Sequence, residues 1–350
     1  MRVKKAAPFV GMVMAECAQS GLIILSKLAM SDGISALVFV LYSNTIAALV
    51  LLPVSFLVHR SSSRPPLTFS VLCGFFMLGV LGCAAQISGY AGINLSSPTL
   101  GTTLLNLVPG FTFILAVVFR MERLDTRGTY TVAKSVGTVV SIAGAFVVTL
   151  YKGPSILGSY LTSNMSMELL STQESNWVLG GCLLFVDCMM AASWLILQAL
   201  ILRKYSAGLV IVFFYCFFVA VQSAVICFIV ETDSEKWSLN SSVRLYSVIY
   251  SGVFGSAFQV GVGTWCLHQT GPVFVAMFKP LGIVITVAIG VIFLGETFYL
   301  GSLIGSIVIV TGFYSVMWGK AKEEMEITSG MEISTSNTQK VPFLQIDCEE

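Results

Sequence analysis

The stretch 78–86, LGVLGCAAQ, returns 173 residues later as SGVFGSAFQ at 251–259. Both stretches place two glycines, an alanine and a glutamine at the same spacing, and single residues recur further along the chain. The further pairs are Pro98 with Pro272, Glu122 with Glu296, Gly137 with Gly305, Gly144 with Gly312, and Lys152 with Lys320. The second half of the chain is therefore a copy of the first.

Each half holds five apolar segments of membrane length, since a helix needs about 20 residues to cross the hydrocarbon layer. They lie at 8–29, 36–58, 70–92, 97–119 and 130–151, and at 177–199, 208–230, 245–267, 272–294 and 300–318. A unit with five crossings ends on the opposite side from its start, so its copy enters the membrane upside down. The sequence predicts an all-α polytopic membrane protein, with ten transmembrane helices arranged as two inverted five-helix repeats.

The composition supports a membrane protein and argues against a nucleic-acid partner. Hydrophobic residues make up 56% of the 350 and charged residues only 11%, whereas soluble proteins carry about 25% charged residues. We expect a first repeat at 1–152, a polar non-cytoplasmic linker at 153–176 and a second repeat at 177–319. A disordered cytoplasmic tail is expected at 320–350, where Glu, Ser and Thr are frequent.

Basic residues indicate the orientation, because they concentrate on the cytoplasmic side. With alternating spans, one side receives Arg2, Lys4, Lys5, Arg60, Arg64, Arg120, Arg123, Arg127, Arg203, Lys204, Lys320 and Lys322. Both termini are therefore predicted to be cytoplasmic. The glycosylation sequons at Asn94, Asn164 and Asn240 fall on the other side, and Asn94 lies too close to its helices for modification. Asn164 and Asn240 remain as candidate sites.

The cysteines and histidines give no sign of a metal site or another cofactor. Eight of the nine cysteines lie within predicted spans, and His59 and His268 are the only histidines. Structural zinc sites need closely spaced ligands of these types. We therefore expect neither a metal nor a cofactor, and we read the cysteines as small apolar packing residues.

Two long stretches carry a resemblance to a known family. They are SSPTLGTTLLNLVPGFTFILAVVFRMERLD at 96–125 and GPVFVAMFKPLGIVITVAIGVIFLGETFYLGSLIGSIVIVTGFYSVMWGKAKE at 271–323. The chain resembles the plant drug/metabolite transporters of the EamA type, and within them the Walls Are Thin-related, nodulin-21-like (UMAMIT) group. The resemblance implies ten helices in inverted repeats, and transport of amino acids or auxin-like compounds across plasma or vacuolar membranes.

Three ionisable residues stand out well inside predicted spans, where a charge costs several kcal/mol unless it has a partner or a water-filled cavity. Glu16 and Asp187 lie at similar depths in equivalent helices, which suggests a shared central cavity. Either carboxyl group could bind substrate or a coupled proton, or only join helices. Lys279 could meet a substrate carboxylate, pair with one of the two acids, or extend to the membrane interface.

Interrupted helices at matching places in the two halves of a transporter mark binding sites. Asn106 and Pro109 in the first repeat stand near the positions of Lys279 and Pro280 in the second. We therefore take Asn106 as a candidate polar contact, and Pro109 and Pro280 as candidate helix breaks, because proline removes a backbone hydrogen bond.

Further polar residues give weaker signals. The buried amides of Gln86 and Gln259 could contact substrate, or could only form hydrogen bonds between helices. Glu122 and Glu296 end equivalent helices and are either interfacial anchors or candidate gates. Glycines at helical spacing, such as Gly137 with Gly144, predict close helix packing.

These features predict a secondary transporter or facilitator of small organic metabolites that works by alternating access, with proton coupling left open. Amino acids are the first substrate class and auxin or indole-type compounds the second. The alternative is a non-transporting membrane receptor or scaffold with a transporter fold. No nucleophile and base of an enzyme can be recognised. The expected partners are the substrate and the lipid bilayer, with a homodimer left open, and the plasma membrane is preferred over the vacuolar membrane.

Overall fold

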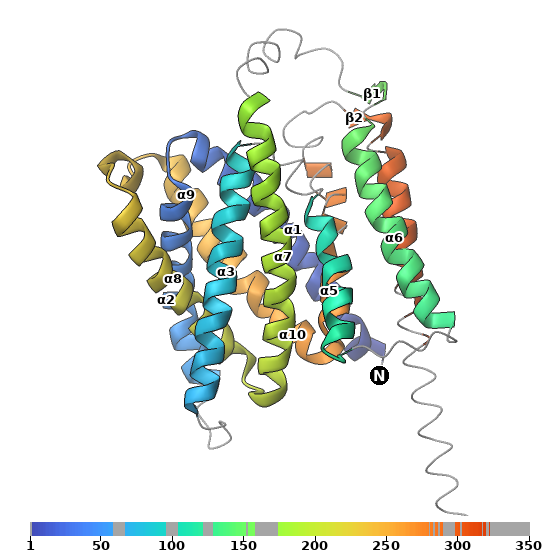
Figure 1. The fold of residues 1–350 in the computed structure, drawn as a ribbon, viewed down its shortest axis with the longest axis horizontal. Coiled ribbons are helices and arrows are strands. Elements are labelled where there is room, and N and C mark those ends of the chain that lie inside the picture. Colours follow the sequence, from blue (N-terminus) through green and yellow to red (C-terminus); the bar gives the residue numbers. More distant parts are fainter. Residues whose placement is uncertain are drawn as a thin grey trace, which may run out of the picture.

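A computed structural model gives the fold of the chain. It describes residues 2–58, 67–95, 104–121, 129–151, 153–157, 174–279, 281–282, 284–285, 288–289, 298–301, 303–316, 318–319 and 322. This part of the chain is almost entirely helical, and most of the long helices run roughly alongside one another (Figure 1).

The first repeat contains α1 (Arg2–Ser31), α2 (Ala36–Val58), α3 (Phe69–Leu95), the 3-10 turn η1 (Leu105–Leu107), α5 (Val108–Val118) and α6 (Thr129–Leu150). The second contains α7 (Glu174–Lys204), α8 (Gly208–Val230), the 3-10 turn η2 (Ser234–Trp237), α9 (Ser242–Tyr250), the π-helix η3 (Ser251–Gln259), α10 (Val260–Thr270), α11 (Pro272–Ala276) and a final helix, Leu303–Val316.

Nine of these segments have the length or the apolarity expected of membrane spans. Six are long enough to cross, namely Ala7–Ser31, Ala36–Ser55, Phe69–Leu95, Leu179–Lys204, Gly208–Val230 and Ser242–Thr270. Three shorter apolar helices are Val108–Val118, Val132–Gly144 and Leu303–Val316. With α11, which starts the remaining predicted span, the described residues fit the expected ten-helix membrane fold.

A small sheet is the one departure from an all-helical fold in the part of the chain that the structure describes. Strand β1 (Ser155–Leu157) pairs antiparallel with β2 (Phe298–Tyr299), and Ser155 lies opposite Tyr299. The backbone N–H of Leu300 also donates to the carbonyl of Pro154, at 2.9 Å. The sheet thus ties the segment after α6 to the start of the last helix.

The two repeats interlock through helices that are equivalent in sequence. A Cβ atom added at Gly79 in α3 would lie 2.7 Å from Cβ of Phe218 in α8. A Cβ atom added at Gly252 in η3 would lie 2.7 Å from Cβ of Ile46 in α2. Gly79 and Gly252 match at an offset of 173, and Ile46 and Phe218 at 172. The contact of α3 with α8 is therefore repeated as the contact of η3 with α2, with the two repeats exchanged, as an inverted duplication requires.

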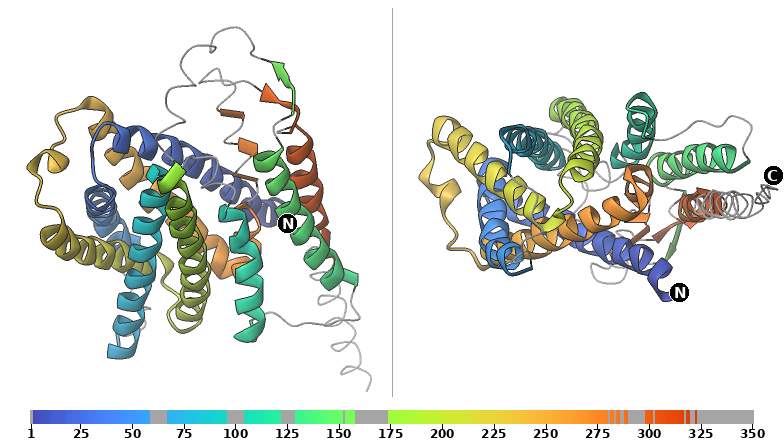
Figure 2. Two further views of the ribbon diagram at one scale, coloured as in Figure 1. Left: turned by 45° about the horizontal axis from the view of Figure 1, so that its top comes forward. Right: turned by 90° about the horizontal axis from the view of Figure 1, so that it is seen from below.

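The crossing of α6 with the last helix shows the same symmetry directly. A Cβ atom at Gly137 would lie 2.6 Å from the carbonyl oxygen of Gly312, and one at Gly144 would lie 3.0 Å from that of Gly305. Gly137 is the sequence equivalent of Gly305, and Gly144 of Gly312. The repeat symmetry exchanges Gly137 with Gly305 and Gly144 with Gly312, so it converts one of these two contacts into the other. The pseudo-twofold axis that relates the repeats therefore passes between the two helices. The two helices lie side by side in both views of Figure 2.

Polar and apolar side chains are distributed as a bilayer demands rather than as water demands. Large apolar side chains such as those of Leu57, Phe228 and Ile229 lie exposed on the outside of the helices. Polar side chains lie inside, with Glu16 and Gln198 both 1% exposed. Since lipid tails are as apolar as leucine, only the interior can satisfy polar groups. The fold therefore collects its polar groups at the centre.

Candidate functional site

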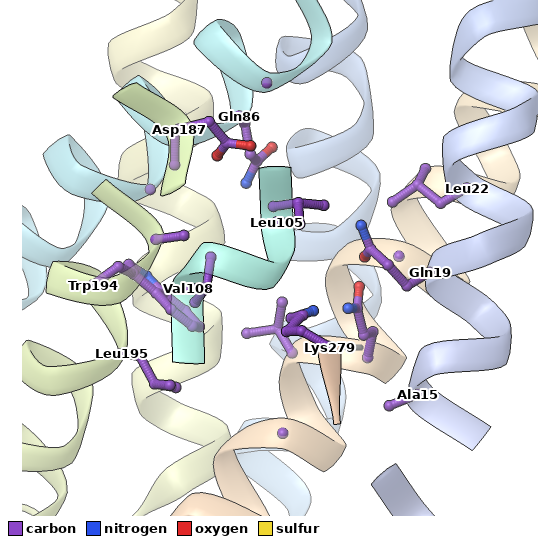
Figure 3. Close-up of a pocket in the computed structure, with 18 of the residues that line it drawn as sticks. Ala15, Gln19, Leu22, Gln86, Leu105, Val108, Asp187, Trp194, Leu195 and Lys279 are labelled. Atoms are coloured by element: carbon purple, nitrogen blue, oxygen red, sulfur yellow. The ribbon is translucent and has the colours of Figure 1, made fainter. Parts of the chain in front are cut away.

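A cavity of about 230 Å³ lies between the two repeats and receives side chains from both. Five of the residues that the sequence singled out line it, namely Glu16, Gln86, Asp187, Gln259 and Lys279. They come from α1, α3, α7, η3 and, for Lys279, the position directly after the turn that follows α11. Figure 3 shows Gln86, Asp187 and Lys279 around the same space. Residues more than 250 positions apart in sequence thus meet in one cavity.

Glu16 and Lys279 form an ion pair inside the protein. The Lys279 Nζ atom lies 3.2 Å from Glu16 Oε1, and the carboxylate is buried while the lysine side chain is 23% exposed. Of the three roles that the sequence left open for Lys279, the structure shows pairing with Glu16. Neither charge then faces the low-dielectric interior alone, which would cost several kcal/mol.

Asp187 is placed differently from Glu16, although both carboxylates line the cavity. A Cβ atom added at Gly89 in α3 would lie 2.8 Å from Asp187 Oδ2, so the glycine leaves room for this carboxylate. No hydrogen bond or ion pair joins Asp187 to another residue within the described part of the chain.

The amide of Gln86 is occupied by its neighbours. Its Oε1 accepts a hydrogen bond from Nδ2 of Asn44 at 2.7 Å, and its Nε2 donates to the hydroxyl of Tyr215 at 2.8 Å. These bonds join α2, α3 and α8. Gln86 therefore links these helices through hydrogen bonds, and it also lines the cavity.

The amide of Gln259 makes no hydrogen bond to any described residue, although it also lines the cavity. It is the last residue of η3, a π-helical segment between α9 and α10. Such wide turns inside α-helices occur frequently at functional sites. Of the two candidate glutamines, Gln259 is therefore the one with a free polar group.

Of the two helix-break candidates, Pro109 lies beside the cavity, next to the lining residue Val108. Pro109 is the second residue of α5, directly after the 3-10 turn η1, which contains Asn106. Lys279 follows a turn after α11, and Pro280 lies outside the described residues. The gate candidates Glu122 and Glu296 and the sequon residue Asn164 also lie outside them. Asn240 is exposed in the loop between η2 and α9.

Sequence reasoning missed several polar residues of the cavity. Gln19 comes three residues after Glu16 on α1, so helical spacing could have placed it on the same face. Gln198 lies in α7, and its Nε2 donates to Thr264 in α10 at 2.7 Å. Tyr215 contributes the hydroxyl that binds Gln86. No pattern in the sequence marks Gln198 or Tyr215, since each is a single polar residue in an apolar run.

Comparison with known proteins places the chain in a family. The EamA-like transporter family matches residues 9–150 and 178–318. The chain is 44% identical to WAT1-related protein At3g28050 of Arabidopsis thaliana, over 98% of this chain and 96% of that protein. It is 42% identical to WAT1-related protein At5g40240 of the same plant, over 95% and 92%. A solved crystal structure of a protein 14% identical in sequence shares the fold, with a TM-score of 0.63 over 89% of this chain and 96% of that one.

The family, the apolar helices and the polar cavity agree with one another. The helices make this a multi-pass membrane protein, and the cavity between its halves is the feature that a carrier of small molecules needs. Two matches of nearly equal length also fit the internal duplication. The chain belongs to the EamA-like transporter family, among its WAT1-related members, and is a membrane transporter of small molecules.

Proposed function

We propose that this transporter is a secondary carrier or facilitator for amino acids, with auxin or indole-type compounds as the second substrate class. The observation that supports this most is the cavity, in which carboxylates, an ammonium group and amides surround a mostly apolar space. An amino acid offers the complementary groups, which are an ammonium, a carboxylate and a side chain. The volume of about 230 Å³ suits a small organic molecule.

The walls of the cavity supply both apolar and polar contacts for such a substrate. Leu22, Leu105 and Leu195 form apolar parts of the lining. Trp194 also lines it, and its ring lies 5.2 Å from that of Tyr215. Ligand sites are generally apolar with a few placed polar groups that fix orientation. Glu16, Asp187, Lys279 and Gln259 are the polar groups that we assign to this role.

Transport follows from alternating access in this proposal. One repeat rocks against the other, and the cavity opens first to one side and then to the other. The short helices η1, α5, η3 and α11 border the cavity, and such interruptions let backbone segments shift while their long neighbours stay packed. The gradient of the substrate, or of protons taken up by Glu16 or Asp187, supplies the free energy.

The orientation and location remain as the sequence predicts them. Both termini face the cytoplasm, and the plasma membrane houses the protein. The exposure of Asn240 supports its use as a reporter, because only a sequon on the non-cytoplasmic side receives a glycan. Loss of a mass shift upon Asn240→Gln in a plant-expressed sample would confirm the side, while Asn164→Gln tests the linker at 153–176 in the same way.

Flux through proteoliposomes tests the function. Purified full-length protein is reconstituted, and uptake of radiolabelled amino acids and indole compounds is measured with and without a pH step. We expect saturable uptake of an amino acid that falls at least tenfold in Asp187→Asn. Saturable binding without flux would instead identify a receptor with a transporter fold. In Glu16→Gln, uptake with an unchanged response to the pH step would remove Glu16 from proton coupling.

A further inference from the structure

The charges on the cavity wall do not balance. Among the described residues that line it, the charged ones are Glu16, Asp187 and Lys279. Glu16 and Lys279 lie 3.2 Å apart and neutralise each other. With all three groups ionised, one negative charge is left over, and it belongs to Asp187.

The surroundings of Asp187 leave this charge available to a ligand. In the part of the chain that the structure describes, no residue donates a hydrogen bond to its carboxylate or forms an ion pair with it. Across from it stands Gly89, which has no side chain that could fill the space. In Figure 3 the carboxylate projects from α7 into the cavity. A carboxylate removed from bulk water gains much from a cation, because its own desolvation is costly.

An aromatic surface lies on the same helix face. Trp194 follows Asp187 by seven residues, which is two helical turns or about 10 Å along α7. The indole ring packs at 55° against that of Tyr215, with 5.2 Å between the ring centres. The Nε1 atom of Trp194 is buried and has no acceptor among the described residues. Flat rings favour such offset or tilted contacts.

We propose that the cavity selects an organic ammonium joined by a short linker to an aromatic ring, and disfavours the corresponding carboxylate. The ammonium binds Asp187, the ring lies against Trp194 and Tyr215, and pairing with Glu16 weakens the attraction of Lys279 for a ligand that carries only a carboxylate. This inference rests on the proposed function, whose substrate site it specifies. It separates the two substrate classes named above, because amino acids carry an ammonium and auxin-type acids do not.

Three indoles that differ only in the group at one end test the proposal. Tryptamine is a cation at pH 7, 3-methylindole is neutral and indole-3-acetate is an anion. Dissociation constants are measured by microscale thermophoresis with the purified full chain in detergent. We expect tryptamine to bind at least tenfold more tightly than 3-methylindole, and indole-3-acetate to bind most weakly. Equal or tighter binding of indole-3-acetate than of tryptamine would overturn the proposal.

Variants assign the preference to its residues. Asp187→Asn should remove the advantage of tryptamine over 3-methylindole, while Asp32→Asn, the same chemical change outside the cavity, should leave the order intact. Glu16→Gln should strengthen indole-3-acetate binding severalfold because it releases Lys279. Retention of the tryptamine preference in a folded Asp187→Asn protein would contradict the assignment. If Asp187→Asn does not fold, the ligand order of the unmodified protein decides alone.

The binding experiment and the flux experiment can contradict the two proposals independently of each other. If none of the three indoles binds but the protein still carries an amino acid in proteoliposomes, the ammonium–aromatic preference is wrong and the transport function stands. If the unmodified protein shows neither binding nor flux for any of these compounds, the proposed function falls, and the preference falls with it.

Discussion

Helix α3 and the segment Ser242–Thr270 are copies of one sequence, yet they have different shapes. The first is a single α-helix over Phe69–Leu95, while the second consists of α9, the π-helix η3 and α10. Both carry the motif that ends in a glutamine at the cavity. The duplication therefore preserved the crossing between the halves and changed the backbone beside the cavity in only one of them.

One extra residue accompanies the change of shape. The two copies match at an offset of 173 up to Gln86 and Gln259, but Gly89 matches Gly263 and Pro98 matches Pro272 at 174. A π-helical turn is the usual way in which an α-helix accommodates an inserted residue. The insertion falls directly after η3, between Gln259 and Gly263, and it leaves the crossing through Gly252 unchanged. The second copy thus has a π-helical turn at the cavity, which the first lacks.

The two copies are also anchored by different residues at the same end of the bundle. Lys27 of α1 donates to the carbonyls of Ile93 and Asn94 at the end of α3, at 3.1 and 2.8 Å. Arg244 near the start of α9 pairs with Asp32, which directly follows α1. In α3 the position of Arg244 is taken by Val71. The C-terminal end of α1 thus holds both copies, one through a lysine and the other through an arginine.

The largest effect on thermal stability is expected at the close helix crossing that the two copies share. Gly79→Leu and Gly252→Leu each force a side chain into a gap that is closed by Phe218 or by Ile46. Overpacking of this kind costs about 1–3 kcal/mol or more. Both variants should lose several degrees in the thermal unfolding midpoint in detergent, and by similar amounts. Gly261→Leu serves as the control, because a Cβ atom there meets no neighbour within 4 Å. A much smaller loss in one variant would show that the two crossings are not equivalent.

The next effect concerns transport, and it tests the π-helix η3, which only the second copy has. Deletion of Val260 removes the residue directly after η3 and restores the spacing of the first copy. We expect a folded protein with an unfolding midpoint within a few degrees of the parent, but at least tenfold lower flux in proteoliposomes. The reason is that a regular α-helix lacks the turn that we assign to movement. Deletion of Val80 in α3 should instead destabilise the protein, because no extra residue is present there. Undiminished flux after deletion of Val260 would rule out a role for the π-helix in transport.

A smaller effect should separate the two glutamines. Gln86→Leu breaks the bonds to Asn44 and Tyr215, and hydrogen bonds between membrane helices contribute about 1 kcal/mol. It should therefore lower the unfolding midpoint. Gln259→Leu breaks no hydrogen bond to a described residue, so it should leave the midpoint unchanged and raise the KM of transport severalfold. The reverse pattern would assign the structural role to Gln259 and the substrate contact to Gln86.

Much of the fold could be predicted because membrane insertion imposes a simple rule. Runs of about 20 apolar residues must form helices, and an odd number of crossings fixes an inverted copy. The same rule drew attention to Glu16, Asp187 and Lys279, because a charged side chain in an apolar span is costly unless it has a partner or a function. Glu16 and Asp187 both line the cavity, as their similar depth in equivalent helices suggested, while their roles in transport stay a prediction.

Other features could not be read from sequence, for identifiable reasons. The offset changes by one residue near Gln259, but a slip in a repeat alignment does not reveal whether a loop or a helix absorbs it. The pairing of Lys279 with Glu16 rather than Asp187 depends on distances between three helices. Tyr215 could not be recognised as a partner of Gln86, because tyrosine is common in apolar helices as a packing residue.

The smallest expected effect is the pH dependence of the anchor that belongs to the second copy alone. A hydrogen bond from Ser241, together with the charge of Arg244, lowers the pKa of Asp32 below its ordinary value of 3.8. A lowered pKa stabilises the fold above the unfolded value and loses that effect as the pH falls through the folded one. The unfolding midpoint of Asp32→Asn should therefore lie slightly below that of the parent at pH 7, and the two should converge below pH 3.8. Lys27→Gln, which removes the anchor of α3, should show the same difference from the parent across this range, since lysine stays charged throughout. A gap between Asp32→Asn and the parent that persists at low pH would mean that Arg244 holds the turn through the carbonyl of Asp32 and its other backbone contacts instead.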